Sequence, residues 1–147
     1  MSKRSVNPQA RRRARRTLLQ ALYAWQMTAA ELGELGSHFA SSDEMRKGDT
    51  EYFLACLQGV VNSVADLDPL FAPYLDRTIA QLDGVERAIL RAGAYELRER
   101  IDVPVRVVID EWVELAKGFG ATESFRYVNG VLDRVARDVR KAEFADR

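Results

Sequence analysis

The stretch "RRRARRTLLQALYAWQ", residues 11–26, decides the fold because its apolar residues recur at three- and four-residue spacing. This spacing is typical of an amphipathic helix with one face in a protein core. Asn7 and Pro8 precede it as an N-cap residue and a proline at the first helical position. We therefore predict a helix that runs to about Thr28. Its expected inward-facing residues are Ala14, Leu18, Ala21, Leu22 and Trp25.

The same helical period recurs along the rest of the chain, with prolines, glycines and capping residues at the junctions. Further helices are predicted at residues 49–66, 68–73, 77–82, 85–97, 104–119 and 124–139. Thr122 or Ser124 is the expected cap of the last helix, and Phe119 is the last inward-facing residue of the helix before it. No alternating strand pattern competes with these assignments. The expected fold class is all-α, with about seven helices.

Residues 29–48 interrupt this pattern with three glycines and three serines, so we predict a loop there. Leu32, Leu35 and Phe39 are expected to tether the loop, because a bare loop of about twenty residues is uncommon in a compact domain. The length of 147 residues favours one domain over residues 1–147. Its ends, residues 1–6 and about 140–147, are expected to be flexible.

The charges divide the chain into a basic start and an acidic body, although 22 Lys/Arg balance 22 Asp/Glu overall. Residues 1–30 carry seven basic residues and no acid, so the remainder has a formal charge of −7. This asymmetry indicates a polyanionic partner for the start and a basic partner for the body. The apolar runs are far shorter than the roughly 20 residues that span a bilayer. We expect a cytoplasmic protein with no membrane segment.

The residue types needed for catalysis or metal binding are scarce. Cys56 and His38 are the only cysteine and the only histidine, which excludes an internal disulfide and a Cys/His metal site. The chain has no phosphate-binding or dinucleotide-binding glycine motif. Asp110, Glu111 and Glu114 stand together without a partner motif and are interpreted as a solvated acidic face. We therefore expect neither an enzyme nor a cofactor.

The arginine cluster at the start of the first helix is the strongest functional feature. At about 100° per residue, one group of side chains lies opposite the apolar stripe. These outward residues are Arg12, Arg13, Arg16, Gln20 and Tyr23, with Arg11 and Arg15 near the edge of the face. No acid occurs before Glu31, and like charges four residues apart destabilise a free helix by a few tenths of a kcal/mol, so a bound polyanion would relieve the repulsion.

Three other interpretations of the cluster compete with polyanion binding. A transit peptide does not fit, because the apolar stripe of this segment includes Trp25 and merges into the predicted core. A solubilising tail would lack the cap and the helical period. An ordinary solvated helix face is the serious alternative. Tyr23 favours nucleic acid over that alternative, because an aromatic ring beside arginines suits unpaired bases and phosphates.

Single-stranded RNA fits these residues better than duplex DNA, because the chain has no helix-turn-helix or zinc pattern. Four or five phosphate contacts predict a salt slope of about −3 for single strands. A second outward patch is expected on the last helix. It comprises Arg126, Tyr127, Gly130 and Arg134. Gly130 is interpreted either as a site of close backbone approach or as a tolerated surface glycine.

Three segments of the chain resemble the NusB family of bacterial transcription antitermination factors. They are "ARRRARRTLLQALYAWQ" (10–26), "VERAILRAGAYEL" (85–97) and "VPVRVVIDEWVELAKGFGATESFRYVNGVLDRVA" (103–136). The resemblance implies two small bundles of the three-helix type. It also implies a protein that binds the boxA element of nascent ribosomal RNA with NusE, a small-subunit ribosomal protein, within an RNA polymerase antitermination complex.

The resemblance also implies roles for individual residues. The arginines of residues 11–16 and Tyr127 match family positions that contact RNA. Tyr74, Glu86 and Glu123 match the side that faces NusE, and Tyr23 is left open between the two surfaces. Some family members form homodimers that cover the RNA surface, and this too stays open. The remaining alternatives are a helical protein-binding adaptor and a relative of the RNA-binding module of ribosomal RNA cytosine methyltransferases.

Overall fold

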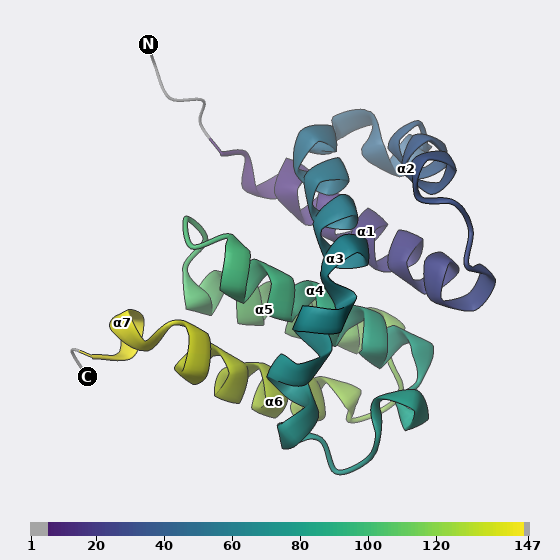
Figure 1. Cartoon of the computed structure of the whole chain (residues 1–147). Helices are drawn as coiled ribbons and strands as arrows, with labels where there is room; N and C mark the ends of the chain where they lie inside the picture. The colour runs from purple at the N-terminus through teal and green to yellow at the C-terminus, as the bar shows by residue number, and fades with distance from the viewer. Residues whose placement is uncertain (1–5, 146–147) are drawn as a thin grey trace.

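The computed structural model describes residues 6–145, which fold into helices joined by short turns, without a strand (Figure 1). The α-helices are α1 (Pro8–Thr28), α2 (Leu32–Ala40), α3 (Thr50–Phe71), α4 (Gly84–Glu99), α5 (Val105–Phe119), α6 (Ser124–Val139) and α7 (Lys141–Phe144). Three short 3₁₀ helices are η1 (Asp43–Lys47), η2 (Ala72–Tyr74) and η3 (Ile79–Gln81). The expected all-α fold class is confirmed.

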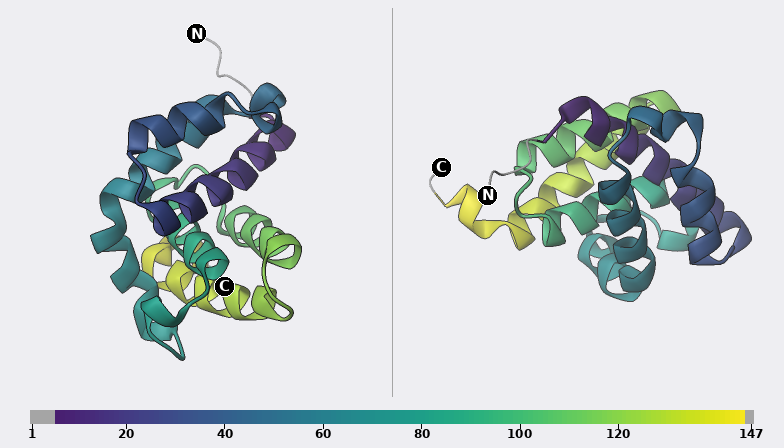
Figure 2. Two further views of the ribbon diagram at one scale, coloured as in Figure 1. Left: turned by 90° about the vertical axis from the view of Figure 1, so that its right-hand side faces the viewer. Right: turned by 90° about the horizontal axis from the view of Figure 1, so that it is seen from above.

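Helix α4 lies at the centre of the molecule and packs against α1, α3, α5 and α6. On one side of it, α1 and α2 pack with the first half of α3, and on the other side α5 packs with α6 (Figures 1 and 2). Helix α3 extends along both groups and joins them (Figure 2). The helices therefore form two small groups, as the family resemblance implies, with α4 shared between them.

The core follows the periodic residues of the sequence. Leu18 and Leu22 of α1 are buried, as are Phe53 of α3 and Trp112 of α5. Each large apolar side chain that leaves water contributes about 1.5–3 kcal/mol to folding. The start of α1 is as expected, since the Asn7 side chain accepts hydrogen bonds from two backbone N–H groups of the first turn.

The predicted loop at residues 29–48 is wrong, because this segment contains α2 and η1. Glu31 caps α2 by accepting hydrogen bonds from the N–H groups of Gly33 and Glu34. The glycines of this segment predict a loop, because glycine disfavours helices, and α2 forms in spite of them. Gly36 has a packing reason: it is buried, and a Cβ there would lie 3.2 Å from a methyl carbon of Leu54 on α3. A small residue lets α2 lie close to α3.

Two helix boundaries also differ from the prediction. Helix α3 continues past Asp68 and Pro69 to Phe71, where we predicted a new helix. The proline removes one backbone hydrogen bond, to the carbonyl of Ala65, and Ala65 is exposed to water. At α6, the N-cap is Glu123 rather than Thr122 or Ser124, with a left-handed φ of 72°.

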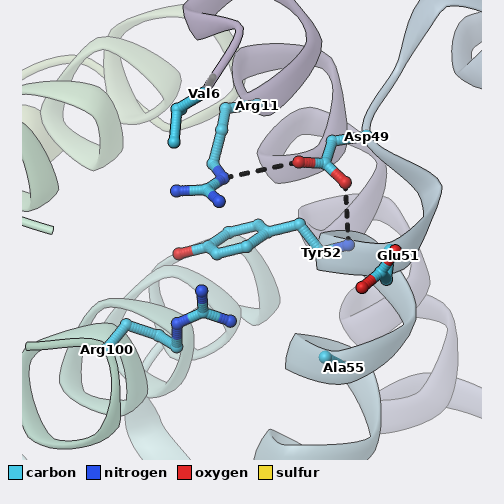
Figure 3. Close-up of a pocket in the computed structure, with 7 residues that line it drawn as sticks. All are labelled: Val6, Arg11, Asp49, Glu51, Tyr52, Ala55 and Arg100. Atoms are coloured by element: carbon cyan, nitrogen blue, oxygen red, sulfur yellow. Dashed lines mark hydrogen bonds and ion pairs between the residues drawn. The ribbon is translucent and has the colours of Figure 1, made fainter. Parts of the chain in front are cut away.

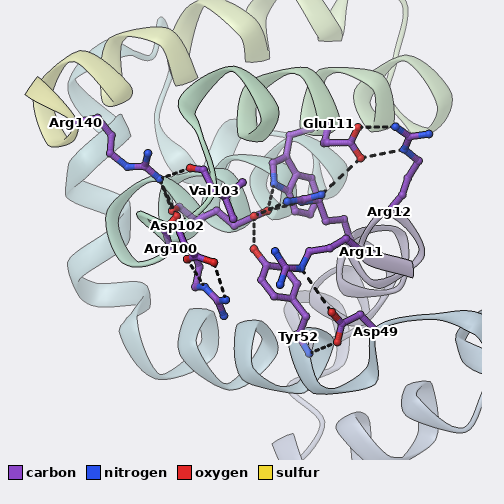
Figure 4. A network of polar contacts seen from close by, with 12 residues as sticks. Arg11, Arg12, Asp49, Tyr52, Arg100, Asp102, Val103, Glu111 and Arg140 are labelled. Atoms are coloured by element: carbon purple, nitrogen blue, oxygen red, sulfur yellow. Dashed lines mark hydrogen bonds and ion pairs between the residues drawn. The ribbon is translucent and has the colours of Figure 1, made fainter. Parts of the chain in front are cut away.

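Of the two ends that we expected to be flexible, residues 1–5 and 146–147 lie outside the described part, and Val6 is exposed. The end that we expected to be flexible begins with Arg140, whose guanidinium is buried. It donates hydrogen bonds to backbone carbonyls around the end of α4, including those of Leu97 and Val103 (Figure 4). Arg140 thereby caps α4 and fixes the start of α7.

Candidate nucleic-acid interface

The outward face of α1 carries three exposed arginines. The side chains of Arg12, Arg13 and Arg16 are 56%, 44% and 52% exposed. Gln20 and Tyr23 are also exposed, further along the helix. The helical geometry that placed these five residues opposite the apolar stripe is confirmed by their exposure.

The exposed arginines have acidic partners from other elements of the fold, although no acid precedes Glu31 in the sequence. Arg12 donates two hydrogen bonds of 3.1 Å to Glu111 of α5, which raise the pKa of its guanidinium together with the charge of Glu111 (Figure 4). Glu44 of η1 lies between Arg13 and Arg16, at N–O distances of 3.0 and 3.4 Å. Both glutamates come from distant elements of the chain, so the local pattern around residues 11–16 does not predict them. Glu111 is an ion-pair partner of Arg12, although its sequence neighbourhood predicts a solvated acidic face.

Arg15 is not part of the exposed face, although the helical period predicts that it lies near the edge of that face. Its side chain is only 3% exposed and donates hydrogen bonds of 2.8 and 2.9 Å to the fully buried Glu96 of α4. Glu96 also accepts hydrogen bonds from the hydroxyl of Tyr52 and, at 2.7 Å, from the indole N–H of Trp112. This network joins α1, α3, α4 and α5, so Arg15 is a structural residue.

The pKa values in this network reflect burial and charge. Burial alone lowers the pKa of Arg15, but the hydrogen bond and charge of Glu96 outweigh it and raise the pKa overall. Burial, followed by the charge of Glu96, raises the pKa of Tyr52. Arg15 is therefore charged and Tyr52 neutral, which is the arrangement that a buried carboxylate requires.

Arg11 occupies a third environment beside the ring of Tyr52. Its guanidinium carbon lies 3.8 Å from the ring centroid, and that of Arg100 lies 4.6 Å from it. Figure 3 shows the two guanidinium groups on opposite sides of the ring. The Arg11 side chain is 13% exposed, with its Nε 3.6 Å from a carboxylate oxygen of Asp49. Arg11 thus borders a small hollow of about 210 Å³ and does not extend the row of Arg12, Arg13 and Arg16.

The ring of Tyr23 packs at the start of α4. It covers Gly84 together with Met27, and a Cβ at Gly84 would lie 2.7 Å from the Tyr23 ring. Tyr23 is 43% exposed and Met27 is 52% exposed. This pair forms an exposed apolar patch at the start of α4, so the ring of Tyr23 is accessible to a partner.

Tyr127, Glu86 and Glu123 border one hollow of about 350 Å³ at the start of α6. The Tyr127 hydroxyl accepts a hydrogen bond from the backbone N–H of Asp76, and the Arg77 guanidinium lies 4.8 Å from the Tyr127 ring. Tyr127 is half-buried and Glu123 is exposed, so both side chains offer surface to a partner.

Glu86 is less accessible than a direct partner contact requires. It is only 6% exposed, and it accepts a hydrogen bond of 2.6 Å from the Ser124 hydroxyl. Tyr74 lies outside this hollow. Its hydroxyl is hydrogen-bonded to Asp138, with the Arg134 guanidinium 5.7 Å from its ring. The residues matched to the NusE side therefore do not form one exposed cluster.

The described residues give no indication of metal or membrane chemistry. Between residues 6 and 145, no three His, Cys, Asp or Glu side chains are grouped as metal ligands. Within the same range, no helix has the length and apolar character to cross a membrane. Cys56 is buried in α3, and burial raises the pKa of its thiol to about 12.

The fold and this surface define a small all-α protein with an exposed basic helix face. The family model "NusB family" matches residues 12–137, and the chain belongs to this family. It is 54% identical over 140 residues to the transcription antitermination protein NusB of Alcanivorax borkumensis, covering 95% of this chain and 93% of the relative. It is 50% identical to NusB of Pseudoalteromonas atlantica, covering 95% of this chain and all of that protein.

Solved structures agree with this family membership. NusB from T. maritima superposes with a TM-score of 0.82 at 29% identity and covers 97% of this chain and 99% of that chain. A structure of the antitermination factors NusB and NusE with double-stranded RNA matches with a TM-score of 0.73 at 25% identity. That match covers 86% of this chain and 96% of the other.

Proposed function

We propose that this chain is a non-enzymatic, cytoplasmic transcription antitermination factor that binds boxA-type RNA of ribosomal RNA leaders. It acts with NusE in an RNA polymerase antitermination complex and supports processive synthesis of ribosomal RNA. Its family and the names of its relatives support this role. A structural neighbour that holds NusE and RNA supports the two partners. The observation that carries RNA binding is the exposed row of Arg12, Arg13 and Arg16.

RNA phosphates replace the carboxylates that pair with this row. Each exposed ion pair contributes only about 0–1 kcal/mol, so Glu44 and Glu111 are weak competitors for a polyanion. Because Arg15 is buried and Arg11 is largely enclosed, three arginines rather than five are available for phosphates. The expected salt slope for single-stranded RNA is then about −2, smaller than the value of about −3 expected from the sequence.

The remaining candidate residues divide between the two partners. Gln20 continues the arginine row and is assigned to the RNA. Tyr127 presents a half-buried ring beside Arg77 and is a second RNA contact. Tyr74 and Glu123 are assigned to NusE. Glu86 acts through Ser124, which it holds at the start of α6, rather than by direct contact.

A titration with three RNAs tests the proposal. The purified protein is titrated with a boxA-like single strand, a scrambled strand of equal length and a duplex of the same sequence, each with and without NusE. Preference for the boxA-like strand that sharpens when NusE is present supports antitermination. Preference for the duplex would show that the ligand is double-stranded RNA and not a single strand. Equal weak binding of all three RNAs, unchanged by NusE, contradicts the proposal and favours the protein-binding adaptor.

A further inference from the structure

Phe119 is exposed although its position in the sequence predicts a core residue. It continues the inward stripe of α5 through Trp112 and Ala116, which are both fully buried, yet it is itself 43% exposed. It is the last residue of α5, and the Gly120 N–H bonds the Ala116 carbonyl at 2.8 Å to end the helix. The ring therefore extends beyond the last layer of the core and faces water.

The ring of Phe119 lies beside the arginine row of α1. The guanidinium carbon of Arg16 is 5.9 Å from the ring centroid, within the range of a cation–π contact. At an exposed site such a contact is weak, so Arg16 can leave the ring and meet a phosphate. The neighbouring Gly118 also borders open space, since a Cβ added there would have no neighbour within 4 Å outside its own turn of helix, and the Phe119 side chain itself is exposed. A flat aromatic surface is thus available next to a phosphate-binding side chain.

A second ring lies across the turn that joins α5 to α6. Phe125 is half-buried, with the Lys117 ammonium 5.2 Å and the Arg126 guanidinium 5.3 Å from its centroid. Lys117 pairs with Glu114 of α5, and Arg126 pairs with Glu123, the N-cap of α6. Both ion pairs are exposed and therefore weak. Aromatic rings with adjacent cations thus occur on both sides of this turn, Phe119 at the end of α5 and Phe125 in the first turn of α6, two residues before Tyr127.

We propose that Phe119 is a base-stacking platform of the RNA site, which extends that site from α1 to the end of α5. A strand whose phosphates lie on the arginine row turns one base onto the Phe119 ring, and it continues past Lys117 and Phe125 toward Tyr127. A phenyl ring has no hydrogen-bonding group, so it accepts the face of any base and contributes affinity without reading sequence. This inference rests on the proposed RNA binding.

Substitutions of Phe119 test the platform. F119A should weaken binding of the boxA-like single strand about five- to tenfold, the lower end of what removing a stacked base costs. F119L keeps an apolar side chain but has no ring, and it should lose nearly as much as F119A. F119W should bind at least as tightly as the original protein. The L54A variant is a matched control, because Leu54 is 40% exposed on α3 and faces α2.

The salt dependence separates stacking from phosphate contact. The Phe119 variants should keep the salt slope of the original protein, whereas R16Q should reduce its magnitude by about 0.7. In F119W, the new exposed indole should be quenched on addition of RNA, in contrast to the buried Trp112. F119L with unchanged affinity, or F119W without quenching, overturns the platform. If the triple variant R12Q/R13Q/R16Q also binds RNA normally, the proposed function itself fails, and the two failures are distinguishable.

Discussion

Arg15 and Arg12 stand three residues apart on α1, and each donates two hydrogen bonds to a glutamate, but their environments are opposite. The Arg15 side chain is 3% exposed and its partner Glu96 is fully buried, whereas the Arg12 side chain is 56% exposed. Loss of one member of a buried ion pair costs about 3–5 kcal/mol, while exposed pairs contribute about 0–1 kcal/mol. One arginine therefore holds the fold together, and the other is available to a ligand.

The largest expected effect is on stability, from removal of the buried arginine. R15M should lower the free energy of unfolding by about 3–5 kcal/mol, because it leaves the buried Glu96 carboxylate without its cation. Urea unfolding followed by circular dichroism measures the loss. R12Q, in the exposed pair, should lose less than about 1 kcal/mol. Equal losses in the two variants would show that burial does not separate these arginines.

A double variant sharpens the same point. In R15M/E96Q the buried charge is gone, and the amide oxygen of the new glutamine can still accept a hydrogen bond from Tyr52 or Trp112. The double variant should therefore be more stable than R15M alone. If it is less stable, the cost of R15M does not come from the uncompensated carboxylate.

The second expected effect is on RNA binding, from the exposed row. R12Q/R13Q/R16Q should abolish measurable binding of the boxA-like strand and leave the thermal unfolding midpoint nearly unchanged, since all three side chains are exposed. Filter binding at several salt concentrations measures the effect, with the original protein expected to show a slope of about −2. A salt-insensitive affinity of the original protein would contradict phosphate contact by this row.

The sequence predicted the parts of this comparison that depend on local pattern. The period of Leu18 and Leu22 predicts which face of α1 is buried, and Asn7 predicts where the helix starts. The pairing of Arg15 with Glu96 could not be predicted in this way, because the two residues are 81 positions apart and meet only after α4 has packed on α1. From the local pattern alone, Arg15 and Arg12 look alike.

The same reasoning explains the other differences. Glu44 belongs to η1, in a segment whose glycines concealed both of its short helices. Phe119 follows the helical period correctly, but a period does not show where the core ends. Exposed functional residues are thus predicted least well where a helix extends past its neighbours or where a partner comes from a distant element.

A smaller effect is expected from the carboxylate that competes with RNA for the row. E44Q removes the charge that pairs with both Arg13 and Arg16, so RNA no longer has to displace it. The affinity for the boxA-like strand should rise about two- to fivefold, in line with the energy of exposed ion pairs. E34Q is the matched control, since Glu34 is exposed on α2 and outside these pairs. Unchanged affinity in E44Q would mean that Glu44 does not compete with the RNA.

Two glycines of the helices, one at an open site and one in the core, differ in the same way, and their substitution has the smallest expected effect. Gly130 lies inside α6 with no neighbour within 4 Å of an added Cβ, so G130A should stabilise the protein by about 0.5–1 kcal/mol. Gly93 of α4 packs against α6, and an added Cβ would lie 2.9 Å from Leu132, so G93A should destabilise it. Thermal unfolding measures both changes. If G130A is more stable but loses affinity for RNA or NusE, the glycine provides a close backbone approach for that partner; if affinity is unchanged, it is a tolerated surface glycine.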